Sequence, residues 1–138
     1  IPTGEVADVE STPFDFRVAK AIGCDIAEEN EQLNGGGGYD HNWCLDGEGV
    51  VRPVATLYEP ESGRKMTVST DQCGIQFYSG NFFDGSYDVK GKVLGHRCAL
   101  ALETQKWPDA IHHKNFPETV LRPGEKYTHI CIYKFTNE

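Results

Sequence analysis

The sequence predicts a mainly β protein with antiparallel pairing, and two observations support this prediction. Short runs in which apolar and polar residues alternate recur along the chain, and glycine, proline or other turn residues separate them. No stretch shows the apolar period of a convincing amphipathic helix, and no internal repeat is visible. Successive strands without helices between them favour antiparallel pairing over the parallel pairing of βαβ units.

Length and charge exclude several classes of protein. A chain of 138 residues suits one domain and is long enough to bury a sizeable core. Its 21 acidic and 13 basic side chains give a formal charge of −8, which argues against nucleic-acid and anionic-membrane partners. No apolar run approaches the roughly 20 residues of a membrane span, and no signal peptide is visible.

The five cysteines predict free thiols rather than a disulfide framework. Three of them, Cys44, Cys98 and Cys131, fall inside apolar runs, and Cys24 and Cys73 stand near glycines. An odd number of cysteines without a Cys-x-x-Cys pair is typical of buried thiols in a reducing compartment. We therefore expect a cytoplasmic protein.

The N-terminal part is expected to contain little regular structure. Residues 1–4 (IPTG) and 12–17 (TPFDFR) predict two short extended pieces punctuated by proline, with Phe14 and Phe16 packing inward. Residues 28–38 (EENEQLNGGGG) predict an exposed loop. Its glycines lack the Lys-Ser/Thr of a phosphate-binding loop, and we expect them to allow a tight entry into the next strand.

Several later runs have the length and alternation of β-strands. The run 50–58 and the run 64–70 form a hairpin across PESG, whose proline and glycine suit a tight turn. The other predicted strands are 39–45, 98–104 and 129–135, and a further strand lies in the stretch 74–85 (GIQFYSGNFFDG), where residues 75–78 alternate.

Glu103 is a candidate functional carboxylate at the end of the predicted strand 98–104. It follows Ala99 and Ala101 on its own strand face, and these small residues leave room for a ligand. A carboxylate flanked by a buried apolar strand is expected to have a perturbed proton affinity. From the residues alone, Glu103 also fits a strand-end glutamate that faces water.

Two more polar side chains are candidates for ligand binding. Asp40 begins a strand and can accept hydrogen bonds from ligand hydroxyls, whereas His41 points to the other face and does not form a dyad with it. Gln76 projects away from the apolar side of its strand, either to a ligand or to solvent. The adjacent His112 and His113 lack further ligands at metal-binding spacing, so no metal site is predicted.

Six motifs support a family resemblance, and they occur in one order along the chain: IPTGE, TPFDFR, GGGYDHN, IQFYSGNFFDG, ALETQKWPD and FPETVLRPGEKY. In these motifs the chain resembles the C-terminal part of galactose mutarotases, or aldose 1-epimerases, from Ile1 to near Phe135. The resemblance implies that residues 1–138 form the C-terminal portion of a single aldose 1-epimerase domain. The implied fold is an antiparallel β-sandwich, the galactose mutarotase-like supersandwich.

The resemblance also implies a function, which is the interconversion of the α and β anomers of free hexoses such as galactose and glucose without a cofactor. The family's catalytic base falls on Glu103 in the LETQ motif, and its sugar-binding residues fall on Asp40 and Gln76. Family members are well over twice this length, and their general-acid histidine lies upstream of the residues present here. The implied partners are therefore a monosaccharide and either an N-terminal piece of the same enzyme or another copy of this chain.

Two other functions remain open from the residues. A glycoside hydrolase would use Asp40 and Glu103 as its carboxylate pair. A non-catalytic carbohydrate-binding fragment would use Trp43 or Trp107 as a stacking platform. The LETQ motif around Glu103 favours the epimerase over both alternatives.

Overall fold

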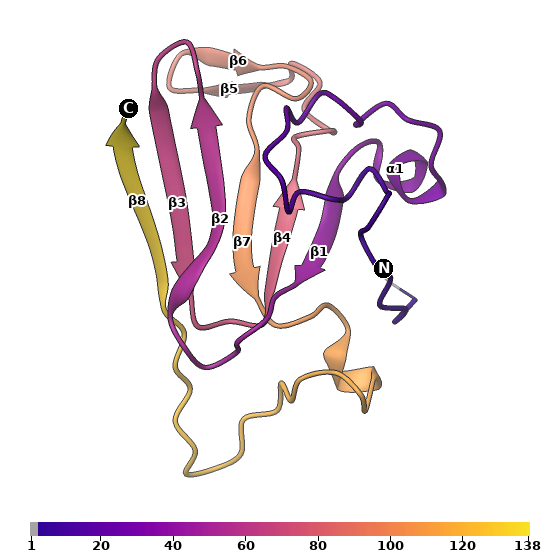
Figure 1. Ribbon diagram of the computed structural model, residues 1–138, viewed down its shortest axis with the longest axis vertical. Coiled ribbons are helices and arrows are strands. Elements are labelled where there is room, and N and C mark those ends of the chain that lie inside the picture. Colours follow the sequence, from indigo (N-terminus) through magenta and orange to yellow (C-terminus); the bar gives the residue numbers. More distant parts are fainter. Residues whose placement is uncertain (1–2) are drawn as a thin grey trace. The chain divides into compact units, whose positions relative to one another are not determined.

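The computed structural model describes residues 3–138, and strands dominate this part of the chain (Figure 1). Its elements are α1 (Glu31–Gly36), β1 (Asp40–Cys44), β2 (Arg52–Glu59), β3 (Arg64–Thr70), β4 (Gly74–Tyr78), β5 (Tyr87–Val89), β6 (Lys92–Leu94), β7 (Ala101–Gln105), the 3₁₀ helix η1 (Ala110–His112) and β8 (Cys131–Asn137). The extended piece predicted at 1–4 begins with Ile1 and Pro2, which lie outside the described residues. Within those residues, no helix is long and apolar enough to cross a membrane.

The chain divides into two compact units, which are described separately. The first unit contains the start of the chain, Trp43–Ile75 and Thr104–Glu138. The second unit contains Glu5–Asn42 and Gln76–Glu103.

A three-stranded sheet with the order β2-β3-β8 belongs to the first unit. The predicted hairpin is confirmed, because β2 and β3 pair antiparallel down to Glu59 opposite Arg64. Strand β8 adds to β3 in antiparallel register, with Tyr133 opposite the fully buried Val68. This last strand begins at Cys131, two positions later than the predicted start at 129.

A buried polar cluster joins the loop after β3 to the segment before β8. The Asp71 carboxylate accepts a hydrogen bond from the backbone amide of Ile130 at 3.0 Å and another from the Gln72 side chain at 2.8 Å. The Arg52 guanidinium donates to the carbonyl oxygens of Thr70 and Gln72 at 2.8 and 2.9 Å. Because buried backbone groups need partners, this cluster stabilises a turn that lacks a regular ladder.

Aromatic side chains form the core of the second unit. The Tyr39 ring is fully buried, and it packs against Phe14, Phe16 and Phe77 with centroid distances of 5.8, 5.2 and 5.3 Å. Its hydroxyl donates to the carbonyl oxygen of Pro13 at 2.9 Å, which satisfies the buried polar group. The inward packing of both phenylalanines is confirmed, although residues around them form turns and bends rather than an extended piece.

The predicted loop 28–38 contains a short helix, so the loop prediction was wrong for α1. The Asn30 side chain caps this helix by accepting from two amides of its first turn, and Leu33 anchors it with only 2% exposure. The glycines after it behave as predicted, because Gly37 and Gly38 adopt φ of 64° and 137° and allow a tight entry into β1.

A second three-stranded sheet has the order β1-β4-β7, and the boundary between the units crosses each of its strands. Strand β4 runs opposite to both of its neighbours (Figure 1). Strand β7 begins at Ala101 rather than at the predicted position 98, and its residues are half-buried or exposed rather than buried. The loop between β4 and β7 also contains the β5–β6 hairpin, which the sequence analysis did not predict.

All five cysteines are free, as predicted, but most of them are not buried. Cys73 is buried and Cys131 is half-buried, whereas Cys24, Cys44 and Cys98 are exposed. An apolar run therefore predicted burial wrongly at Cys98, because the strand begins after it.

Candidate functional site

Two of the three candidate site residues contact each other directly. The Gln76 side-chain amide donates a hydrogen bond to Asp40 Oδ1 at 2.9 Å. Asp40 is exposed at the start of β1, and Gln76 is half-buried in the middle of β4. The pair lies on the face of β4 opposite to Ile75 and Phe77, which are only 5% and 8% exposed. This arrangement presents a carboxylate and an amide together on the less buried face of the sheet.

Glu103 lies on β7, the strand that neighbours β4 on the side away from β1. It is the exposed residue of this strand, between the half-buried Leu102 and Thr104. The three candidates therefore come from three adjacent strands, and all of them belong to the second unit. The structure brings Asp40 and Gln76 into contact and places Glu103 on the next strand of the sheet, β7. The role of Glu103 as the catalytic base stays a prediction.

The His41 side chain supports the backbone and does not pair with the Asp40 carboxylate. Its Nδ1 accepts a hydrogen bond from the backbone amide of Asp40 at 3.0 Å, so the ring proton sits on Nε2. The ring packs against Phe14 with a centroid distance of 4.7 Å. Burial lowers the pKa of His41, although the Asp40 charge opposes this shift. Because Nδ1 accepts from the backbone amide, it does not donate to the Asp40 carboxylate, which agrees with the prediction that the two side chains do not form a dyad.

The sequence analysis missed the residues that support the start of β1. The Asn81 side chain is only 8% exposed, and it donates to the carbonyl oxygens of Gly36 and Tyr39 at 2.9 and 3.0 Å. Ser79 donates to Asn81 Oδ1 at 2.5 Å. The signal was the SGN sequence that directly follows the strand of Gln76, in which two hydrogen-bonding side chains flank a glycine.

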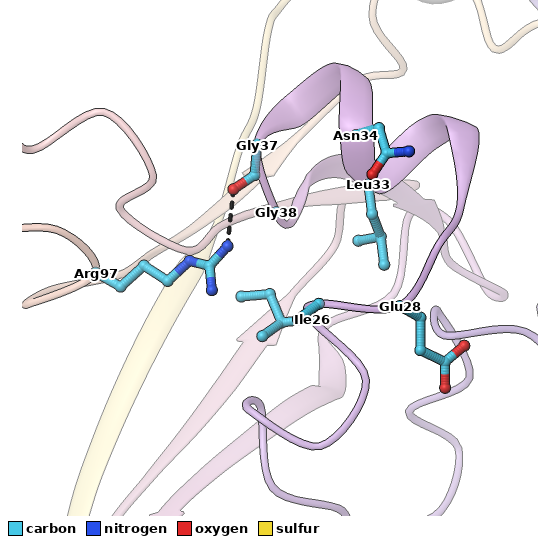
Figure 2. A pocket seen from close by; sticks show the side chains of 8 residues that line it. Ile26, Glu28, Leu33, Asn34, Gly37, Gly38 and Arg97 are labelled. Atoms are coloured by element: carbon cyan, nitrogen blue, oxygen red, sulfur yellow. Dashed lines mark hydrogen bonds between the residues drawn. The ribbon is translucent and has the colours of Figure 1, made fainter.

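A cavity of about 290 Å³ lies beside this support rather than at the three candidates (Figure 2). Its apolar wall includes Ile26 and Leu33, and Glu28 also lines it. Arg97 lines it as well and donates through Nη2 to the carbonyl oxygen of Gly37 at 2.8 Å. Since none of the three candidates lines this cavity, it is a neighbouring structural feature and not the candidate site.

The adjacent histidines of the first unit are engaged with one carboxylate. Asp109 forms a hydrogen bond with His112, and its other oxygen lies 3.3 Å from His113 Nε2. The hydrogen bond from His112 lowers the pKa of Asp109. Within residues 3–138, no three His, Cys, Asp or Glu side chains are grouped in a geometry that could hold a metal ion.

The comparison with known families agrees with the motifs. The family model described as "Aldose 1-epimerase" matches residues 1–134. The chain belongs to the aldose 1-epimerase family. Among its relatives, human galactose mutarotase is 44% identical over 137 residues, which cover 99% of this chain and 39% of the relative. The aldose 1-epimerase of Escherichia coli (strain K12) is 33% identical over 141 residues, which cover 100% of this chain and 40% of the relative.

Similarity to a solved structure supports the aldose 1-epimerase fold. The crystal structure of an aldose epimerase homologue from C. elegans matches with a TM-score of 0.72 and 25% sequence identity. The match covers 99% of this chain and 40% of that structure. The predicted mainly antiparallel β-sandwich class is therefore confirmed, and the chain spans about two fifths of the length of these relatives.

Proposed function

We propose that this chain provides the catalytic base and part of the sugar site of an aldose 1-epimerase. The reaction is the interconversion of α and β anomers of free hexoses such as galactose and glucose. The contact between Gln76 and Asp40 is the observation that best supports this proposal. With Oδ1 engaged by Gln76, the exposed Asp40 carboxylate can accept a sugar hydroxyl at Oδ2, and polyol recognition depends on such fixed acceptors.

The proposed chemistry needs one base and one acid. The Glu103 carboxylate removes the proton of the anomeric hydroxyl while an acid protonates the ring oxygen, and the bond between C1 and the ring oxygen breaks. The open aldehyde rotates about its C1–C2 bond, and the ring closes on the other face as both protons return. Glu103 is suited to this role because it is exposed on a strand that neighbours Gln76.

We propose that residues 1–138 are the C-terminal portion of a single aldose 1-epimerase domain and that the general acid comes from the portion that this chain does not span. The relatives are covered only to 39–40%, which leaves ample chain for that portion. The partner would be an N-terminal piece of the same enzyme, or another copy of this chain that covers its exposed apolar side chains, such as those of β8. The five free thiols fit a reducing compartment such as the cytoplasm.

Polarimetry of freshly dissolved α-D-glucose and α-D-galactose tests the proposed function. The protein tested is this chain joined to, or co-expressed with, the portion of human galactose mutarotase that it does not match. Faster anomer exchange supports the proposal. Release of reducing sugar from a glycoside would indicate a hydrolase that uses Asp40 and Glu103 instead. Sugar binding without faster exchange would indicate a carbohydrate-binding fragment.

A further inference from the structure

Two side chains hold the backbone that leads into β1. The Asn81 amide donates to the carbonyl oxygens of Gly36 at 2.9 Å and Tyr39 at 3.0 Å. The Arg97 guanidinium donates to the carbonyl oxygen of Gly37 at 2.8 Å, as Figure 2 shows. We call Asn81 and Arg97 together the glycine clamp.

The glycine clamp is itself fixed by further hydrogen bonds within the second unit. Ser79 donates to Asn81 Oδ1 at 2.5 Å, and His96 Nδ1 donates to the Asn81 backbone carbonyl at 2.9 Å. The backbone amide of Arg97 donates to the carbonyl oxygen of Gly80 at 3.0 Å. The Asn81 amide is satisfied, because its oxygen accepts one hydrogen bond and its nitrogen donates two, and a broken bond there would leave an unpaired buried polar group. Arg97 is less completely satisfied, because its Nε is buried without a hydrogen-bond partner among residues 3–138. The glycine clamp can therefore impose a position on the backbone that it contacts.

The backbone that it contacts has no strong preference of its own. Residues 35–38 are four consecutive glycines, which sample positive and negative φ about equally. Gly38 adopts φ of 137°, and a Cβ there would lie 2.4 Å from Asn81 Oδ1 and 3.0 Å from Arg97 Nη2. The glycine clamp and the glycines thus fit closely. The clamp acts together with the C-terminal cap of α1, in which the amides of Gly37 and Gly38 donate to the carbonyl oxygens of Asn34 and Leu33.

We infer that Asn81 and Arg97 are positioning residues that fix Asp40 for sugar binding, an inference that rests on the proposed function. Asp40 is the first residue of β1 and follows the clamped segment directly. Without the clamp, a smaller fraction of molecules would present the carboxylate correctly, and apparent sugar affinity falls in proportion to that fraction. The hydrogen bonds that the glycine clamp donates end on Gly36, Gly37 and Tyr39, which precede β1, so we expect proton removal by Glu103 in the bound complex to be unaffected.

Kinetics of Asn81→Asp in the completed protein test this inference. The change keeps the shape of the side chain but replaces its donor with a carboxylate that faces two carbonyl oxygens. We expect KM to rise about tenfold, which corresponds to the loss of a hydrogen bond of about 1.4 kcal/mol, with kcat within about twofold. Arg97→Lys keeps the charge and is expected to raise KM about threefold. It also serves as the test if Asn81→Asp fails to fold.

A matched control and a double mutant separate positioning from general damage. Asn34→Asp introduces the same charge on the exposed face of α1, beside the turn, and is expected to leave KM and kcat unchanged. In an Asp40→Ala background, Asn81→Asp should change KM by less than about twofold, because Asn81 affects sugar binding only by positioning the Asp40 carboxylate, which is absent there. Independent, multiplicative effects of the two changes would overturn the inference.

Amide chemical shifts provide a readout that does not depend on activity. Asn81→Asp should move the ¹⁵N–¹H shifts of Tyr39 and Asp40, and Asn34→Asp should not move them. Unchanged shifts in Asn81→Asp would overturn the inference, whatever the kinetics. If the parent protein neither exchanges anomers nor binds sugar, the proposed function fails, while the amide shifts still decide whether the glycine clamp holds Asp40.

Discussion

Gln76 and Asp40, which are 36 positions apart, are joined by a hydrogen bond of 2.9 Å from the amide to the carboxylate. Gln76→Glu would replace this donor with a second carboxylate. Two adjacent carboxylates raise the pKa of one of them, so the pair is most repulsive at neutral pH and repulsion weakens as pH falls. We expect the KM of Gln76→Glu, relative to the parent, to be high at about pH 7.5 and lower at about pH 5. If the ratio of the KM of Gln76→Glu to that of the parent is the same at both pH values, the side chains of residues 76 and 40 are not adjacent in the completed protein.

Glu103→Gln tests the assignment of the base. We expect kcat for anomer exchange to fall by a factor of about 10²–10⁴, the usual contribution of one general base. The melting temperature should not change, because Glu103 is exposed. Polarimetry of freshly dissolved α-D-glucose measures the rate, and Glu61→Gln, at an exposed turn position, is the control. Near-normal kcat in Glu103→Gln would rule out the assignment.

Asp71 should make the stability of the first unit depend on pH. Its pKa lies below the ordinary value of 3.8, chiefly because the backbone amide of Ile130 donates to it. A lowered folded-state pKa means that the stabilisation is fully present above the unfolded-state pKa and is lost as pH falls through the folded-state value. Asp71→Ala should therefore lower the free energy of unfolding by about 1–3 kcal/mol at neutral pH and by less below about pH 4.

Urea unfolding at both pH values measures this loss. Asp88→Ala, at an exposed position of β5, is the control and should change little at either pH. Equal destabilisation by Asp71→Ala at neutral and acid pH would show that packing, rather than the charged hydrogen bond, explains the effect.

Strand β8 should make the isolated chain associate. It is an edge strand of its sheet, and its exposed apolar side chains include Ile132 at 49%, Tyr133 at 46% and Phe135 at 74%. Exposed apolar edge strands tend to pair with other chains. We expect light scattering to give a mass above that of one chain, and Phe135→Lys to lower it. Val93→Lys, on the exposed β6, is the control and should not lower the mass.

The same chain alone should be nearly inactive as a mutarotase, because protonation of the ring oxygen would fall to water. The loss of general-acid catalysis removes a factor of about 10²–10⁴. Joining the chain to the portion of human galactose mutarotase that it does not match should restore anomer exchange. A monomer of this chain with full activity would contradict both this prediction and the proposed partner.

Strands were predictable where apolar and polar residues alternate, and the short elements without this pattern were missed. Helix α1 depends on a cap by Asn30 and on one buried side chain, Leu33, which is too little for a periodic pattern. The turn of the β5–β6 hairpin places Lys90 and Gly91 at positive φ, and of the two only Gly91 indicates this conformation by its residue type. Two residues at positive φ between short alternating segments are typical of a tight hairpin.

Alternation could predict which way the candidate side chains point, but not which of them meet. It placed Gln76 opposite the apolar side of β4, and this is confirmed by the burial of Ile75 and Phe77. The contact with Asp40 depends on how two strands far apart in the chain pair, and a sequence pattern within one strand contains no information about that pairing. The SGN sequence after β4 indicated hydrogen-bonding side chains at this turn, but the contacts of Asn81 with Gly36 and Tyr39 depend on the same distant pairing.

The strand order β1-β4-β7 also bears on when the site can form during synthesis. Each neighbouring pair is distant in sequence, so no local hairpin brings two candidate residues together, and closing such long loops slows folding. A nascent chain on the ribosome lacks the third strand until Ala101–Gln105 has emerged. The sugar site proposed above is therefore complete only after β7 has paired with β4, whereas the contact between Asp40 and Gln76 needs only β1 and β4.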